Sequence, residues 1–411
     1  MKAKPAPGRT AARPVQLSGR ITSVRPSPTL AITALARDLR AQGVDVISFG
    51  AGEPDFNTPE PIVREAKQAL DEGFTQYTAV GGIPELKEGI ARKLLRDNGC
   101  EYRPDEIIVT VGAKQAFYSV CQVLLDPGSE LIIPSPYWVS YSDIVSLAGG
   151  IPVLCPLGEE NGFDLDPDAI ERCVTPATRA VLINSPSNPT GAVYSRASIE
   201  AVVQLALRRG LLVITDEIYE KIIYDGAVHV CPAGLGEEAR DRTIVINGFS
   251  KAYAMMGWRL GYVAAPGPIV TALDTFQGQG TNNPTSFVQR AAVVAIDSED
   301  SVFEPMVREF KKRRDVIVFG LNTIEGVRCT LPQGAFYAFP RVDGLFGKTG
   351  PTGKITTSEG LCRYLLEEGR IAAVPGSAFG AEGHLRLSYA TSLENIQTGL
   401  DRMAEAVARL S

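Results

Sequence analysis

The stretch Asn247-Gly-Phe-Ser-Lys251, continued by Gly257-Trp-Arg-Leu-Gly-Tyr262, decides how this chain is interpreted. Its lysine follows directly on an apolar run and a glycine-containing turn, among aromatic, apolar and small residues. A lysine taken alone is far more often a solvated surface charge. Here burial is expected to lower its pKa, which leaves the amine able to act as a nucleophile and proton carrier. Ser250 and Arg259 flank it, and a guanidinium fork suits a phosphate dianion.

The segment Thr215-Asp-Glu-Ile-Tyr219 comes immediately after the apolar run 211–214. An aspartate at the carboxyl end of a strand can simply cap the next helix, and for Asp216 alone that interpretation is equally good. The alternative is that its carboxylate keeps a ring nitrogen protonated, which makes the ring an electron sink.

Two further loops offer groups that bind oxygens and anions. Asn184-Ser-Pro-Ser-Asn188-Pro-Thr-Gly191 is rich in turn formers, but it also presents amides that could bond a phenolate oxygen. Val111-Gly-Ala-Lys114 joins a strand to a helix, and free N–H groups at a helix start bind phosphate. Trp138 could stack on a planar ring, although one tryptophan is more often part of the core.

An arginine lies inside an alternating strand pattern near the end of the chain, in Leu385-Arg-Leu-Ser-Tyr389. Arg386 could be a surface residue paired with an acid. It could equally be a two-pronged clamp for a substrate carboxylate, because the guanidinium geometry matches a carboxylate.

Around these segments, apolar strands alternate with helical patterns from about residue 60 to 300. Short apolar runs of this kind are typical of parallel strands that helices cover on both faces. The runs cover residues 107–111, 131–133, 180–183, 211–215, 243–246 and 260–264. The pattern predicts an α/β fold with a mostly parallel central sheet, whose ligand lies at the carboxyl ends of the strands.

After about residue 300 the pattern changes to a long helical stretch, three short strands and a last helix, which Thr391 and Glu394 are expected to cap. This predicts a second, smaller α+β domain. The expected division is a disordered basic arm over 1–17, an N-terminal segment over 18–59 that joins the small domain, a large cofactor-binding domain over 60–310 and the small domain over 311–411.

Composition argues against several classes of protein. A net charge of −6 gives no basic field for nucleic acid, and no run of ~18 apolar residues predicts a membrane span. Seven scattered cysteines without a C-x-x-C pair favour a reducing, cytoplasmic compartment over a disulfide framework. Because His229 and His384 are the only histidines, no metal site is expected and a Ser-His-Asp triad is poorly supplied.

Together and in this order, the motifs resemble the fold-type I, class I aminotransferases, which use pyridoxal 5′-phosphate, from about residue 18 onward. Further matching segments are A-G-E-P-D-F at 51–56, G-G-I-P-E-L at 81–86, P-Y-W-V-S-Y at 136–141, Q-G-A-F-Y at 333–337 and R-L-S-Y at 386–389. Within this family the chain is similar to the bacterial and plant subgroup of aspartate aminotransferases, which includes prephenate aminotransferases. Two residues depart from the pattern: Met256 replaces a usual Thr, and Arg25 replaces a usual Lys.

The resemblance implies a homodimer and a role for each matching residue. Lys251 carries the cofactor as a Schiff base and moves the proton, while Asp216 pairs with the ring nitrogen. The other implied cofactor contacts are Tyr219, Asn188, Trp138, Ser250, Arg259, Ala113, Lys114 and, from the neighbouring subunit, Tyr77. The implied substrate contacts are Arg386 and the backbone of Gly52 for the α-carboxylate, Lys114, Ser27 and Thr29 for the distal carboxylate, and also Trp138 and Asn188.

The resemblance predicts amino transfer between aspartate or glutamate and 2-oxoglutarate or oxaloacetate, with prephenate as a further candidate substrate. Several alternatives stay open at this point. Prephenate, aromatic or neutral amino acids could be the main substrates, or the same fold could act as a lyase. A dinucleotide enzyme fits poorly, because Gly50-Ala-Gly52 lacks the third glycine of that fingerprint. A regulator on this fold would need a DNA-binding domain, and the arm before residue 18 is too short for one.

Overall fold

The computed structural model describes residues 15–22, 24, 26, 28–351 and 353–411. Most of the predicted basic arm, together with Arg25 and the candidate substrate contact Ser27, therefore lies outside the described residues.

A seven-stranded sheet forms the centre of the larger part of the molecule, with the order β2-β8-β7-β6-β5-β3-β4. Its strands are rich in valine and isoleucine, which fit a pleated surface that is buried on both faces. The strands are β2 (Ile107–Thr110), β3 (Glu130–Ser135), β4 (Ile151–Pro156), β5 (Thr178–Asn184), β6 (Leu212–Asp216), β7 (Thr243–Gly248) and β8 (Gly261–Ala264). The α/β fold with a mostly parallel sheet is confirmed.

Two strands differ from the sequence prediction. Strand β8 runs antiparallel to both of its neighbours, β2 and β7, so the expectation that the run 260–264 is parallel is wrong. Its residues are as buried as those of a parallel strand, and burial alone does not encode direction. Strand β4 was not predicted, because prolines at 152 and 156 and half-exposed side chains mark it as an edge strand.

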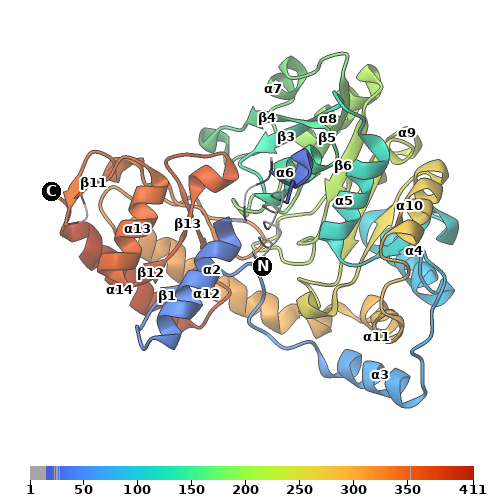
Figure 1. The fold of residues 1–411 in the computed structure, drawn as a ribbon, viewed down its shortest axis with the longest axis horizontal. Coiled ribbons are helices and arrows are strands. Elements are labelled where there is room, and N and C mark those ends of the chain that lie inside the picture. Colours follow the sequence, from blue (N-terminus) through green and yellow to red (C-terminus); the bar gives the residue numbers. More distant parts are fainter. Residues whose placement is uncertain (1–14, 23, 25, 27, 352) are drawn as a thin grey trace, which may run out of the picture.

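Helices cover both faces of this sheet (Figure 1). Alternate strand residues point to opposite sides, so Ile108 packs with α5, α6 and α10 while Ile107 and Val109 pack with α4 and α11. Helices α7 and α8 cover the rest of the second face. The helices of this part are α3 (Glu60–Asp71), α4 (Pro84–Asn98), α5 (Ala113–Leu124), α6 (Ser140–Leu147), α7 (Pro167–Arg172), α8 (Arg196–Arg209), α9 (Glu237–Arg240), α10 (Gly267–Gln279) and α11 (Ser286–Asp297).

The smaller part gathers the C-terminal elements around a three-stranded antiparallel sheet of order β13-β14-β9 (Figure 1). Its strands are β9 (Tyr337–Ala338), β10 (Thr349–Gly350), β11 (Gly353–Lys354), β12 (Ile371–Ala372), β13 (Val374–Pro375) and β14 (Leu385–Ser388). Its helices are α12 (Glu304–Asn322), α13 (Ser358–Gly369) and α14 (Leu393–Ala408). The predicted cap at Thr391 and Glu394 is wrong by one residue, because Ser392 accepts the Asn395 N–H at the start of α14.

The N-terminal segment contains α1 (Gly19–Thr22), α2 (Pro28–Ala41) and β1 (Ile47–Ser48). From α2 onward it lies with the C-terminal elements (Figure 1), whereas α1 contacts α6 of the larger part. Strand β1 pairs in parallel with β12, and α2 contacts β12 and β13. The domain division at residue 310 stays a prediction, and the continuous helix α12 crosses that point. None of the helices in the described parts of the chain is both long and apolar enough to cross a bilayer.

Candidate active site

A cavity of about 370 Å³ lies at the carboxyl ends of the central strands, where the N-terminal segment and β14 meet the large sheet. It brings together every predicted site residue that the structure describes, except Tyr77. The residues that line it are Thr29, Thr33, Gly50, Gly52, Ala113, Lys114, Trp138, Tyr141, Asn184, Asn188, Asp216, Ile218, Tyr219, Ser250, Lys251, Met256, Arg259, Tyr337 and Arg386.

Asp216 is the last residue of β6 and sits buried at the base of the cavity. Tyr141 donates a hydrogen bond of 2.6 Å to its Oδ2, and the Ile218 N–H donates to Oδ1 over 3.3 Å. Burial raises the pKa of Asp216 to about 6, although both hydrogen bonds act to lower it. A desolvated carboxylate in this position favours a cationic partner, and such a partner would restore its ordinary acidity.

Tyr219 and Asn188 sit on the wall next to Asp216. The hydroxyl groups of Tyr219 and Tyr337 lie 2.9 Å apart. Asn188 is held by its backbone N–H, which donates to Asn184 Oδ1 over 3.0 Å, and Asn184 also donates to the Asp216 carbonyl. These bonds fix the phenol and the amide in place at the mouth of the cavity.

Arg386 reaches the cavity from β14 and is almost completely buried. Its Nη1 donates to Asn188 Oδ1 over 3.1 Å and its Nη2 to the Gly50 carbonyl over 3.0 Å, while its Nε has no hydrogen-bond partner among the described residues. The guanidinium lies 4.5 Å from the centre of the Tyr337 ring. A buried N–H without a partner carries a desolvation penalty that an anionic ligand would relieve.

Lys251 follows β7 and points toward the N-terminal segment, where its Nζ donates to the Gly52 carbonyl. Burial lowers the pKa of Lys251 to about 8, and the positive charge of Arg386 adds to this, while Glu53 and Asp216 act against it. With a pKa of about 8, roughly a tenth of this amine is neutral at pH 7, and the neutral form is the one that acts as a nucleophile or base.

Gly112, Ala113 and Arg259 form a cradle at the start of α5. Gly112 has a φ of 86°, and a Cβ at this position would lie 2.6 Å from Arg259 Nη2, so any other side chain would fill the space that the guanidinium uses. Arg259 donates to the Met256 carbonyl over 2.9 Å, and Ser250 is buried next to this turn. The free N–H groups at the start of a helix and an adjacent guanidinium fit a phosphate group.

Lys114, in the first turn of α5, places its Nζ 4.9 Å from the centre of the Trp138 ring. Burial lowers the pKa of Lys114, and Arg259 lowers it further. Among the described residues, no carboxylate forms an ion pair with Lys114, Arg259 or Arg386, which we call the cation set. Three cations around one cavity with no protein acid to pair with them indicate a ligand that carries several negative charges.

Tyr77 stands apart from these residues. It is 85% exposed and lines a shallow surface depression with Gln76 and the loop 281–287, so it does not reach the cavity of its own chain. This placement is compatible with the predicted contact across a dimer and does not test it.

Sequence reasoning missed two residues that hold the site together, Tyr141 and Tyr337. Tyr141 supplies the hydrogen bond to Asp216, and Tyr337 bonds Tyr219 and underlies Arg386. Tyr141 is the last residue of segment 136–141, and Tyr337 is the last residue of segment 333–337. Both segments carried the family resemblance, which was the signal that could have pointed to these two tyrosines.

A family model described as aminotransferase class I and II matches residues 44–403. The chain belongs to this family. The aminotransferase is 47% identical to the aspartate aminotransferase of Geobacillus stearothermophilus, over 95% of this chain and 98% of that one. It is 44% identical to the aspartate/prephenate aminotransferase of Nitrosomonas europaea, over 96% and 100% of the two chains.

The solved structure of the aspartate aminotransferase from Rhizobium meliloti is also similar to this aminotransferase. It superposes with a TM-score of 0.94 at 45% identity, covering 97% of this chain and 100% of that one. The recognition of the family from the sequence is therefore confirmed.

Proposed function

We propose that this aminotransferase binds pyridoxal 5′-phosphate in the cavity and moves the amino group between aspartate or glutamate and 2-oxoglutarate or oxaloacetate. The observation that carries the proposal is the cation set around Lys251 and Asp216, since no carboxylate in the described part of the chain forms an ion pair with any of its three members. A phosphate and two carboxylates are the negative groups that this cofactor and these substrates bring.

The residues present fit the cofactor. The cradle of Gly112, Ala113 and Arg259, with Ser250, would hold its phosphate, and the desolvated Asp216 would keep its ring nitrogen protonated. Tyr219 and Asn188 would bond the phenolate oxygen, and Trp138 would cover the ring. When bound, the cofactor withdraws electrons from the Cα of the amino acid.

Lys251 is the base in this proposal. Its Nζ would hold the cofactor and, as a free neutral amine, would accept the proton from the substrate Cα. The lowered pKa of about 8 keeps that nitrogen partly neutral, as a base requires. Tyr141 orients Asp216 throughout, since its hydroxyl is a fixed donor to the carboxylate.

The substrate is held at both ends by cations. Arg386, whose Nε is free to donate, binds the α-carboxylate together with the backbone at Gly52. Lys114 binds the distal carboxylate with Thr29 and with Ser27, which lies outside the described residues. The loop Thr281-Asn-Asn283 contains no arginine that could serve instead, so Lys114 is the proposed determinant of dicarboxylate preference.

We further propose that the enzyme is a cytoplasmic homodimer in which Tyr77 contacts the phosphate of the partner's site. Its support is a tyrosine that is 85% exposed in the single chain. Mixing Tyr77→Phe protomers with Lys251→Ala protomers should generate hybrid dimers with one fully native site. If activity stays at the plain average of the two parent dimers, Tyr77 serves its own subunit.

A spectral titration tests the proposed function. The purified protein with pyridoxal phosphate should show the absorbance of the bound cofactor, and aspartate or glutamate should convert it, with 2-oxoglutarate restoring it. Alanine and phenylalanine serve as controls without a distal carboxylate. Release of ammonia or carbon dioxide in place of amino transfer would favour a lyase. Prephenate belongs in the same titration, because the Nitrosomonas relative is named for it.

A further inference from the structure

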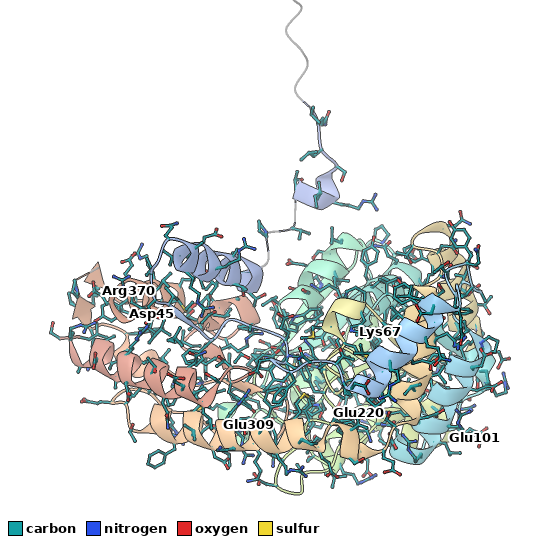
Figure 2. All side chains as sticks on the ribbon, turned by 90° about the horizontal axis from the view of Figure 1, so that it is seen from below. Asp45, Lys67, Glu101, Glu220, Glu309 and Arg370 are labelled. Atoms are coloured by element: carbon teal, nitrogen blue, oxygen red, sulfur yellow. The ribbon has the colours of Figure 1, made fainter. Side chains whose placement is uncertain are left out.

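A buried network of charges lies behind the cavity and takes no part in the proposed chemistry. It consists of Lys93 from α4, Glu217 and Glu220 from the segment after β6, His229, and Asn98 with Asn247. Figure 2 labels Glu220 within the body of the large domain, whereas Glu101 lies at its outer edge. Glu217 is fully buried and Lys93 is 2% exposed, so these are not solvated surface charges.

Each charge of the network has a partner. Lys93 Nζ donates to Glu220 Oε1 and to Asn98 Oδ1, and Asn98 Nδ2 donates to Glu220 Oε2 over 2.8 Å. His229 Nε2 lies 3.0 Å from Glu217 Oε2. Burial acts to lower the pKa of His229, but Glu217 and Glu220 outweigh it and the pKa is raised. Glu217, Glu220 and His229 each place one ligand atom within 4.8 Å of the others, and within this group the Lys93 ammonium forms an ion pair with Glu220.

The two glutamates of the network are the chain neighbours of two predicted site residues. Glu217 directly follows Asp216, and Glu220 directly follows Tyr219. Glu220 Oε1 also accepts a hydrogen bond of 2.7 Å from Asn247 Nδ2. Asn247 lies in β7, four residues before Lys251, and its Oδ1 accepts the N–H of Gly248, the last residue of that strand before the turn to the lysine.

We propose that Glu220 is a positioning residue that ties the segment carrying Asp216 and Tyr219 to the turn carrying Lys251. The tie is the hydrogen bond from Asn247, and Lys93 and Asn98 hold the carboxylate in place to accept it. The inference rests on the proposed function, since the hydrogen bond would fix the base, Lys251, relative to the groups that hold the cofactor. Displacing a reacting group by about 1 Å can cost up to ~10²-fold in rate.

Two double variants separate positioning from mere stabilisation. Lys93→Met with Glu220→Leu removes both charges and the acceptor for Asn247. Lys93→Met with Glu220→Gln also removes both charges but keeps an acceptor oxygen. Because neither leaves a buried charge unpaired, both should fold, and they differ in the acceptor oxygen that residue 220 offers to Asn247 and Asn98.

The measurements are the pH titration of the bound cofactor's absorbance and the separate values of kcat and KM for aspartate. We expect the Leu variant to shift the titration midpoint and to lose about tenfold in kcat with little change in KM, while the Gln variant stays near wild type. Identical titrations and kcat values in both variants and the wild type would overturn the proposal. A wild-type protein that binds no cofactor would instead overturn the proposed function.

A single variant covers the case in which the double variants do not fold. Asn247→Leu removes the tie but leaves Glu220 bonded to Lys93 and Asn98. It should shift the titration midpoint in the same way. Arg314→Met is the matched control, because Arg314 is also 2% exposed and paired with acids, Asp225 and Asp315, away from the cavity. Arg314→Met should lower the melting temperature without shifting the midpoint, and a wild-type midpoint in Asn247→Leu would refute the tie.

Discussion

The two sides of the cavity differ in how their polar groups are satisfied. On the side formed by β5, β6 and α6, Asp216, Asn184 and Tyr141 are bonded to one another within the protein. The other side is formed by α5, η4 (Met256–Trp258) with its flanking turn, and β14. Within the described residues, the cation set there contacts carbonyls, an amide oxygen and aromatic rings, and it forms no ion pair with a carboxylate.

This difference indicates that the two sides have different functions: one fixes geometry and the other binds anions. Groups that are bonded internally fix geometry and charge before any ligand arrives, so removing one should reduce the rate for every substrate. Cations without an acid stay poorly compensated until an anion binds, so removing one should depend on the charge of the substrate. Variants of Asp216 and Lys114 test whether each residue behaves like the other groups on its side of the cavity.

Lys251→Ala should have the largest effect, because Lys251 belongs to neither side and is the proposed base. We expect a loss of turnover on the order of 10⁴-fold or more, while the protein still binds pyridoxal phosphate without covalent attachment. Single-turnover kinetics and the absorbance of the bound cofactor measure the two effects separately. Near-normal turnover would refute the whole assignment. Lys67→Ala, at an exposed lysine of α3, is the control and should change nothing (Figure 2).

Asp216→Ala should come next. We expect kcat to fall by ~10²-fold or more for aspartate and for alanine alike, since the loss of the electron sink does not depend on the distal group. Tyr141→Phe, which removes only the supporting hydrogen bond, should have the same pattern and a smaller size. A loss in Asp216→Ala of less than about tenfold would mean that this residue merely caps the following turn.

Lys114→Ala should reduce activity on acidic substrates more than activity on neutral ones. We expect kcat/KM for aspartate to fall by about 10- to 1000-fold, the range of a charge-assisted contact, with a much smaller change for alanine or an aromatic amino acid. The alternative is that Lys114 only neutralises the phosphate. In that case acidic and neutral substrates lose equally, or cofactor affinity alone falls, and the assignment of dicarboxylate preference is removed.

The smallest effect is a shift in a pH profile. In the cofactor-free protein, Lys251 should react with an amine-directed reagent with an apparent pKa of about 8, because burial disfavours its charged form. Reactivity should therefore rise as pH increases through 8, where ordinary lysines are still protonated. Peptide mapping across a pH series, with exposed Lys67 as the internal reference, measures this. A midpoint above 10 for Lys251 would show that its amine is solvated.

Most of the fold could be predicted because periodicity and burial are local properties of a sequence. The runs that became β2, β3, β5, β6 and β7 are continuous valine and isoleucine segments, and a buried parallel strand has that composition. The direction of β8 could not be predicted, since an antiparallel strand covered on both faces has the same composition as a buried parallel one. At the start of α14, Thr391 and Ser392 are both good caps, and packing chose between them.

The candidate site also contains residues that the local sequence could predict and residues that it could not. Lys251, Asp216 and Arg386 stand at strand ends or in a strand pattern where their chemistry could be inferred, and the motifs gave the rest by resemblance. Tyr141 and Tyr337 act through partners 75 and 118 positions away in the chain, and no local pattern records such contacts. Glu220 was passed over for the same reason, because its partners come from α4 and β7.

The pairing of β1 with β12 sets the order in which the molecule can be completed during synthesis. The partner of β1 begins at Ile371, so a ribosome must add more than 300 further residues before Ile47 can pair. At about 5 to 20 residues per second, that interval lasts roughly 16 to 64 s. Gly50 and Gly52 follow β1 directly, and Arg386, which bonds the Gly50 carbonyl, is made later still. A nascent chain stalled before that point would carry Lys251 without Arg386 and its bond to Gly50, so the wall of the cavity is completed only after Arg386 has been synthesised.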